Sequence, residues 1–276
     1  MTLSERVDEL MSSGNYRQAG EFLERELERA RETNNTADEL CVLNEQLGYY
    51  RCAGQHEKAM EACDRVLACL EYYQGHGDED CATTLLNAAT ACRAAGQQEK
   101  ALELYGMAGQ IYGEVLEPGD TRYAALYNNA ALACRETGAP DRAKVYLASA
   151  VNILEGAGEE YTGELATALA NLGLMLMGAG EYDTAEEQLD RALALFGRLG
   201  NDPHRAAALA GAANLRALRG EYQAAIPLYR AALEQIEFYF GRNGDYAVTC
   251  RNCAAAAAAA GDDELAREMR ALGEGR

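Results

Sequence analysis

The sequence has no tryptophan, only four prolines and only three histidines among its 276 residues. So few prolines leave long stretches in which helices can run without interruption. The scattered histidines do not form the clusters that metal or acid–base sites use. No window holds the eighteen or more apolar residues of a spanning helix, and the first residues lack the basic start and apolar core of a signal peptide. We therefore expect a cytoplasmic, all-α protein without a metal or cofactor.

Basic residues are scarce as well: 25 Lys and Arg stand against 44 Asp and Glu, which gives a formal net charge of −19. Such an excess of negative charge repels phosphate backbones and anionic membrane surfaces. We therefore expect neither nucleic acid nor a membrane as a partner. Gly-rich phosphate loops and GxSxG phrases are also missing, so the sequence does not predict an enzyme.

Nine cysteines are spread along the chain, an odd number in a protein too large to need disulfide staples. Cys250 and Cys253 form a CxxC phrase, but no second pair completes a set of four zinc ligands. Both thiols fall on the apolar face of an expected helix. We expect the cysteines to be reduced and to serve mainly as small core residues.

One short phrase, a Gly followed five residues later by an Ala, recurs seven times with spacings of 40, 42, 42, 42, 40 and 41 residues. Each Gly separates two stretches of helical periodicity, so it can end one helix in a left-handed turn before the next begins. The Ala falls about one turn into the second helix, where a larger side chain would hold the two helices apart. The pairs are Gly14-Ala19, Gly54-Ala59, Gly96-Ala101, Gly138-Ala143, Gly180-Ala185, Gly220-Ala225 and Gly261-Ala266.

Each period therefore predicts one helix-turn-helix hairpin, and each hairpin needs its neighbours to bury its apolar stripe. Pro140 is expected just inside a second helix, and Asp202-Pro203 is expected to begin a helix with Asp202 as its N-cap. We expect a single domain over residues 1–276, with units at 1–33, 34–75, 76–117, 118–158, 159–200, 201–242 and 243–276.

The repeated phrases resemble the tetratricopeptide repeat (TPR), and their length is similar to that of the kinesin light chain class. Segments such as GEYQAAIPLYRAALEQIE (220–237) and YNNAALACRETG (127–138) carry the likeness. The sequence departs from the pattern at Cys92 and Cys134, where an aromatic residue or Leu is usual, and in the alanine run of residues 254–260. The resemblance implies a right-handed α-solenoid of seven hairpins whose first helices line a groove for peptides or partner proteins.

Helical geometry places the residues thirteen, ten, nine, six, three and two positions before each turn Gly on one arc, away from the apolar stripe. Arginines recur three positions before the Gly in three consecutive units, and asparagines recur nine or ten positions before it. Arg can donate forked hydrogen bonds to carboxylates, and Asn can bond both backbone groups of an extended peptide. The candidate peptide-binding residues are Asn44, Arg51, Asn87, Arg93, Asn128, Asn129, Arg135 and Asn171.

These residues also have a structural interpretation. The asparagines can link adjacent hairpins by hydrogen bonds, and the arginines can pair with Glu136 and its neighbours. The sequence leaves both interpretations open. It predicts a scaffold that holds an extended, acidic segment of a partner protein, and the alternative is an assembly subunit that associates with itself and has no peptide ligand. The identity of the partner and the oligomeric state do not follow from the sequence.

Overall fold

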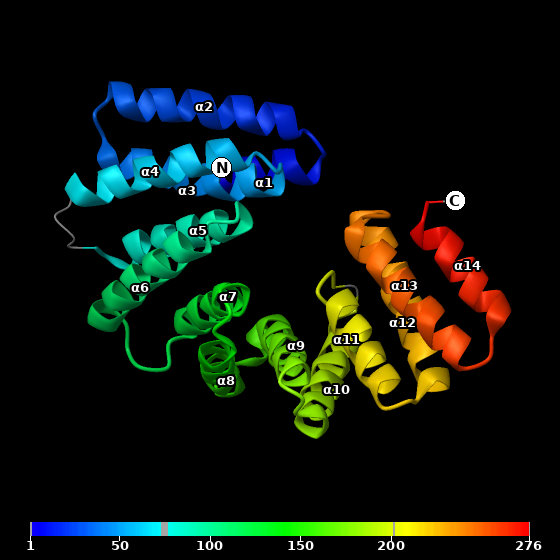
Figure 1. Ribbon diagram of the computed structural model, residues 1–276. Coiled ribbons are helices and arrows are strands. Elements are labelled where there is room, and N and C mark those ends of the chain that lie inside the picture. Colours follow the sequence, from blue (N-terminus) through cyan, green and yellow to red (C-terminus); the bar gives the residue numbers. More distant parts are fainter. Residues whose placement is uncertain (1, 73–76, 201, 276) are drawn as a thin grey trace. The chain divides into compact units, whose positions relative to one another are not determined.

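The computed structural model describes residues 2–72, 77–200 and 202–275, and these residues form helices and turns with no strand (Figure 1). Fourteen α-helices alternate as the first and second helix of the expected hairpins, and a short 3-10 helix, η1 (Glu159–Tyr161), precedes α9. The first helices are α1 (Leu3–Ser12), α3 (Thr36–Cys52), α5 (Glu79–Ala94), α7 (Thr121–Glu136), α9 (Thr162–Gly178), α11 (Arg205–Leu218) and α13 (Gly244–Ala259). The second helices are α2 (Tyr16–Glu32), α4 (His56–Tyr72), α6 (Gln98–Val115), α8 (Pro140–Glu155), α10 (Tyr182–Leu199), α12 (Tyr222–Phe240) and α14 (Asp263–Gly273).

The helices group into two compact units, residues 1–139 and residues 140–276. The first unit contains α1 to α7 and the second contains α8 to α14. Within a unit, a second helix packs against the first helix of its own hairpin, as α4 does with α3, and against the first helix of the hairpin that follows, as α4 does with α5. The exception is α8, whose hairpin partner α7 belongs to the other unit and which packs against α9. First helices also contact one another, α3 with α5 and α9 with α11, whereas no comparable contact joins two second helices in the described parts of the chain. The first helices therefore form a continuous layer within each unit.

The repeated Gly and Ala positions explain the hairpins. All seven turn glycines have a positive φ, between 66° at Gly54 and 82° at Gly261, in the left-handed region that other residues rarely adopt. All seven alanines are buried, none more than 2% exposed. The prediction of a left-handed turn in every period is confirmed, and the burial of every alanine agrees with its expected place in the packing.

The helix boundaries confirm one expectation and correct another. Pro140 is the first residue of α8, as expected for a residue that has no backbone N–H to lose there. The helix expected to begin at Asp202-Pro203 begins instead at Arg205, so Asp202 is not its N-cap. The Asp202 carboxylate accepts a hydrogen bond from the backbone N–H of His204 at 2.8 Å. The Asp202 side chain therefore stabilises the turn that precedes α11 and does not cap the helix itself.

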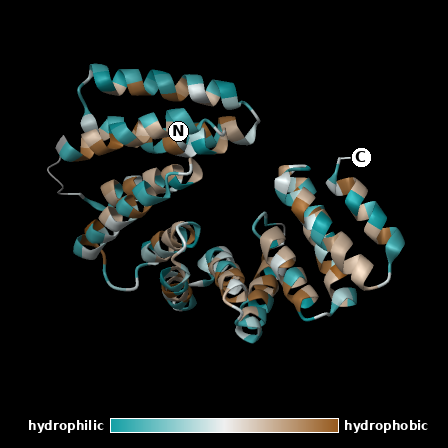
Figure 2. Cartoon of the chain, in the orientation of Figure 1, coloured by the Kyte–Doolittle hydropathy of each residue, from teal (hydrophilic) through white to brown (hydrophobic). Residues whose placement is uncertain are grey.

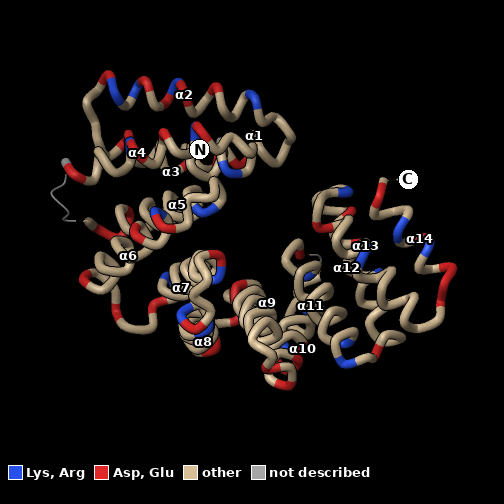
Figure 3. The backbone as a smooth tube through the Cα atoms, in the orientation of Figure 1, with Lys and Arg blue, Asp and Glu red and all other residues tan. Residues whose placement is uncertain are grey.

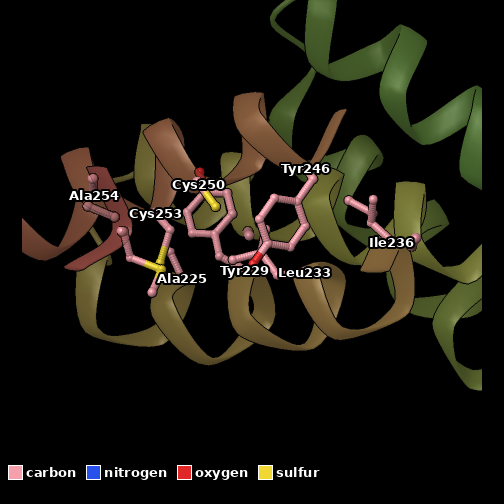
Figure 4. Close-up of a cluster of buried hydrophobic side chains, with 12 residues drawn as sticks. Ala225, Tyr229, Leu233, Ile236, Tyr246, Cys250, Cys253 and Ala254 are labelled. Carbon is pink, nitrogen blue, oxygen red and sulfur yellow. The ribbon is translucent and has the colours of Figure 1, made fainter. Parts of the chain in front are cut away.

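The core is a series of small clusters between consecutive hairpins. Figure 4 shows one of them, in which Tyr229 and Leu233 of α12 meet Tyr246 and Cys250 of α13. Hydrophobic and hydrophilic residues alternate along the helices, as buried and solvated faces require (Figure 2). The apolar stripe of α9 is buried along its length, at Leu169, Leu172, Gly173 and Leu176.

Candidate peptide-binding face

The three arginines that recur three positions before a turn Gly lie in the first unit, one in the last turn of each of α3, α5 and α7. A cation in a last turn is favoured by the negative end of the helix dipole, which gives a local reason for its position. Arg51 and Arg135 are exposed, whereas Arg93 between them in the chain order of the helices is partly buried. We call the exposed side of these last turns the arginine edge, defined by Arg51, Arg93 and Arg135.

Arg93 already holds a carboxylate. Its Nη1 donates to Oε1 of Glu136, on α7, at 2.8 Å, and both side chains are about three-quarters buried, at 22% and 28% exposure. The structural interpretation of the arginines, pairing with Glu136, is therefore confirmed for this residue. Nε of Arg93 has no hydrogen-bond partner in the described part of the chain. This Nε is buried, so it is an unsatisfied donor that an acceptor from outside the chain cannot reach.

Arg51 and Arg135 make no ion pair with any described residue. Their guanidinium groups are exposed to solvent, so a carboxylate from outside the chain can reach them without displacing an internal partner. A forked guanidinium binds a carboxylate with two parallel hydrogen bonds. Along the arginine edge, two available cations therefore flank one that is already neutralised.

The asparagines of the first unit mainly connect helices. Asn87 Nδ2 on α5 donates to Asn44 Oδ1 on α3 at 2.8 Å, which joins two consecutive first helices. Asn129 Nδ2 donates to the carbonyl oxygen of Ala125 in its own helix, α7, at 3.0 Å. The structural interpretation is thus confirmed for Asn44 and Asn87. Asn128, on α7, and Asn171, on α9 in the second unit, are half-buried and each has an interaction partner.

The second unit contains a link of the same kind. Asn252 Nδ2 on α13 donates to Asn214 Oδ1 on α11 at 3.1 Å, and the hydroxyl of Tyr229 donates to the same oxygen at 2.7 Å. Burial raises the pKa of Tyr229 to about 12, so this hydroxyl stays protonated and remains a donor at neutral pH. The amide oxygen of Asn214 thereby joins three helices.

A polar cleft of about 290 Å³ lies between the N-terminal halves of α3 and α5. Asn44 reaches its wall, and the acidic residues Asp78 and Asp80 line it as well. Backbone N–H donation by Cys81 lowers the pKa of Asp78, which keeps that carboxylate charged. The first helices therefore present acidic groups near their N-termini and the arginine edge at their C-termini. Of these two places, the arginine edge carries the charge that attracts carboxylates.

The periodic pattern gives no sign of a charge cluster centred on Glu39. This carboxylate is 5% exposed and accepts from Arg65 Nε at 2.6 Å, Arg65 Nη2 at 3.0 Å and Arg31 Nε at 3.1 Å. The Arg65 donors, followed by those of Arg31, hold the pKa of Glu39 below its ordinary value. Because these residues come from α2, α3 and α4, the cluster ties two hairpins together. It is structural, and it leaves Arg31 and Arg65 unavailable to a ligand.

The two cysteines of the CxxC phrase lie in the protein core. Cys250 and Cys253 are both fully buried, and burial raises the pKa of Cys253 to about 11, which confirms their expected place in the core. No group of three or more His, Cys, Asp or Glu residues that could hold a metal occurs among the residues that the structure places. None of the described helices combines the length and the apolar composition needed to span a bilayer. Acidic and basic residues are present on helices of both units (Figure 3).

Comparison with known proteins agrees with this arrangement. The sequence profile of the tetratricopeptide repeat matches residues 38–112, 80–156 and 164–230, more than half of the chain. A search of the curated proteins finds no match.

Three solved structures with similar folds are each less than 25% identical, so they bear on the fold only. The kinesin light chain TPR-like repeats from Podosopora anserina are 19% identical over 70% of this chain and 92% of theirs, with a TM-score of 0.56. BtubC (BKLC) from P. vanneervenii is 18% identical over 99% of this chain and 90% of its own, with a TM-score of 0.57. The apo form of RapI is 15% identical over 99% and 77%, with a TM-score of 0.71.

Proposed function

Because the chain belongs to the tetratricopeptide repeat family and is similar to its kinesin light chain class, we propose that it is a non-catalytic, cytoplasmic scaffold for a partner protein. The first unit would hold an extended acidic segment of that partner along the arginine edge. Nine free thiols fit a reducing compartment. No group on the arginine edge is both nucleophilic and paired with a base, which supports a binding role over a catalytic one.

The observation that carries the proposal is the state of the three arginines. Arg93 binds the carboxylate of Glu136, while Arg51 and Arg135 on either side of it are exposed and without an ion pair in the described chain. The Glu136 carboxylate on Arg93 supports the proposal, because a ligand carboxylate could make the same contact. The asparagine pair Asn44–Asn87 contributes a fixed spacing between α3 and α5 rather than free hydrogen-bonding groups.

The geometry of a helix stack sets the spacing of the ligand. Packed helices lie about 8–10 Å apart, so α3 and α7, with α5 between them, are separated by roughly 16–20 Å. An extended chain advances about 3.3 Å per residue, so two acidic residues about five or six positions apart would reach Arg51 and Arg135 together. A third carboxylate midway would compete with Glu136 for Arg93.

Fluorescence anisotropy with short labelled peptides tests this directly. The probe peptides carry two Glu residues about five or six positions apart, and the matched peptides carry Gln at the same places. We expect the Glu peptides to bind at least about tenfold more tightly, with affinity that falls as salt is added. Equal binding of the Glu and Gln peptides would contradict the proposal.

Two exposed cysteines report where the peptide lies. Cys52 follows Arg51 at the arginine edge, whereas Cys41 lies on the same helix at the acidic cleft. A bound acidic peptide should slow the alkylation of Cys52 and leave the rate at Cys41 nearly unchanged. The opposite pattern would place the ligand at the cleft and not at the arginines.

A second candidate function is self-association, and one surface favours it. Phe238 and Phe240, at the end of α12, are 73% and 55% exposed, and the rings of Phe238 and Tyr239 are in edge-to-face contact at 4.8 Å. Exposed aromatic clusters of this kind often mark protein contacts. Light scattering over a concentration series tests it: an increase in mass that the double substitution F238S/F240S abolishes would support an assembly subunit.

A further inference from the structure

Two buried thiols meet between the second and third hairpins. Cys63 lies on α4 and Cys92 on α5, and neither side chain has measurable exposure to solvent. Their sulfur atoms are 3.5 Å apart, and Cys63 Sγ also donates to the carbonyl oxygen of Ala88 at 3.4 Å. A thiol that touches the backbone of the facing helix shows that α4 and α5 approach closely at this level. Both cysteines are free thiols.

The neighbouring residues account for this approach. Ala59 precedes Cys63 by about one helical turn, and Ala88 precedes Cys92 by about one turn. Both alanines are almost fully buried, at 1% and 0% exposure. Small side chains on facing turns let two helices pack with a short interaxial distance. The two sulfurs are already in van der Waals contact, so closing the remaining roughly 1.5 Å to a bond of about 2.05 Å needs only small side-chain rotations.

We propose that Cys63 and Cys92 form an oxidation site, at which a hydroperoxide converts the two thiols into a disulfide that joins α4 to α5. The site belongs to the packing between hairpins and not to the arginine edge, so it does not depend on the proposed function. Exposed Cys41 and Cys52 have no thiol neighbour of this kind among the residues that the structure describes, and they serve as the comparison.

The chemistry balances with hydrogen peroxide as the oxidant. The Cys92 thiolate attacks one peroxide oxygen, the O–O bond breaks, and the leaving hydroxide takes up a proton to become water. The resulting sulfenic acid is then attacked at sulfur by Cys63. The S–S bond forms, the S–O bond breaks, and the departing hydroxide accepts the Cys63 proton as a second water. Two thiols are oxidised, and one peroxide is reduced.

The surroundings support Cys92 as the first nucleophile. In the structure Cys92 Sγ donates to Cys63 Sγ. The neighbouring Cys63 thiol, which can donate to the ionised form, lowers the pKa of Cys92, and the Lys100 ammonium adds to this effect. Lys100 is held in place by Asp64, with Nζ 2.6 Å from Oδ1. When Cys92 ionises, the Cys63 hydrogen can turn from the Ala88 carbonyl to the thiolate. The proton donor and the resolving thiol are then the same residue.

The chain offers a matched control in Cys250 and Cys253. These thiols are as fully buried as Cys63 and Cys92, but they lie three residues apart on one helix, α13. Residues so placed have Cβ atoms about 5–6 Å apart, whereas a disulfide needs about 3.5–4.5 Å. Oxidant that merely enters the core would reach both pairs, but only the pair between α4 and α5 can close.

Peptide mapping of the full chain tests the proposal. The C41S/C52S variant, which cannot form disulfides through its exposed thiols, is exposed to hydrogen peroxide overnight, unfolded in iodoacetamide and digested with trypsin without reductant. We expect residues 59–65 to be recovered linked to residues 66–93, with a mass lower by two hydrogen atoms and fragmentation that places the bond at Cys92. Cys250 and Cys253 should be recovered as alkylated thiols. Local opening sets the rate, so oxidation should be slower than at Cys52 in the natural sequence.

The C63A variant supplies the second measurement. Alanine fits a fully buried position next to Ala62, so the fold should be retained, which circular dichroism checks. Without its resolving partner, Cys92 should be trapped by dimedone as the sulfenic acid, and the linked peptide should vanish. Recovery of both thiols unchanged, linkage of Cys63 to another cysteine, or equal oxidation of Cys250 and Cys253 would overturn the proposal.

Discussion

The two units link their first helices with the same side chain but different acceptors. In each unit an Asn nine positions before the turn Gly, Asn87 or Asn252, donates its amide to an Asn on the preceding first helix. The acceptor lies ten positions before its own Gly in the first unit, at Asn44, and six positions before it in the second, at Asn214. Position nine is therefore the constant part of the link. Not every Asn at this position makes such a link, because Asn129 donates within its own helix. Where the Asn joins two helices, it serves the stacking of hairpins and does not require a ligand.

The arginines follow a different rule. At the position three residues before the turn Gly, the first unit carries Met11 and then Arg51, Arg93 and Arg135, whereas the second unit carries Met177, Ala217 and Ala258. A residue needed for stacking would be expected in both units, as the amide is. The difference indicates that these arginines are not required to build the hairpins. Their restriction to one unit is the contrast that the proposed peptide site would explain.

The largest effect is expected from removing the shared acceptor in the second unit. Asn214→Ala leaves the buried Tyr229 hydroxyl and the Asn252 amide without a partner, and should lower the free energy of unfolding by about 2–3 kcal/mol. Urea unfolding of the full chain measures it. Thr90 occupies the matching position in the first unit and lies 3.0 Å from the Tyr105 hydroxyl. N214T should therefore recover part of the loss, and an N214A variant as stable as the natural chain would contradict the three-way link.

The second-largest effect is expected from charge reversal at the arginine edge, which should weaken peptide binding by the first unit. The double variant R51E/R135E is expected to weaken binding of the Glu peptides by about 2 kcal/mol, roughly 30-fold, because two exposed ion pairs are lost and replaced by repulsion. Anisotropy measures the affinity, and circular dichroism should show unchanged helicity. M177E/A258E, at the matching positions of the second unit, is the control and should change affinity less than about threefold. A similar loss in both variants would remove the distinction between the units.

Removal of the acceptor in the first unit should cost less than in the second. Asn44→Ala breaks one hydrogen bond to the half-buried Asn87, whose amide can then turn to water in the adjoining cleft. We expect a loss of about 1 kcal/mol in the free energy of unfolding, measured as for N214A. A cost equal to that of N214A would mean that the two links are equivalent despite their different partners.

The smallest expected effect is an increase in peptide affinity, in contrast to the losses predicted above. Glu136→Gln should release Arg93 and raise the affinity for the Glu peptides by about 0.5–1 kcal/mol, roughly two- to fivefold. The control is Glu155→Gln, which breaks the ion pair between Glu155 and Arg191 in the second unit and should leave peptide affinity unchanged. If E136Q weakens binding, then the Arg93–Glu136 pair shapes the site and does not compete with the ligand.

The fold could be predicted because its determinants are local. A Gly that must take a positive φ and an Ala five residues later fix each hairpin within a few residues, and their period shows where the next begins. The predicted start of α11 was wrong because an Asp side chain can stabilise a turn as well as cap a helix, and the sequence around Asp202 does not distinguish the two.

The site was only partly predictable for a geometric reason. Helical spacing places Arg51 and Arg135 on the exposed arc, but whether such a side chain is free depends on the helix opposite. The contacts of Cys63 with Cys92 and of Glu39 with Arg65 join residues 29 and 26 apart. These contacts depend on the rotation and separation of packed helices, which a periodic pattern does not specify.

The order of helix contacts has a mechanical consequence. Within each unit, every substantial contact joins helices that are adjacent or next but one along the chain. In the described parts of the chain, no hairpin therefore packs against one that is distant in sequence. A force applied along such a stack meets its interfaces one after another and not all together. Held at its ends, each unit would lengthen in steps of one hairpin and re-form them in turn when released, so that it would yield gradually under load.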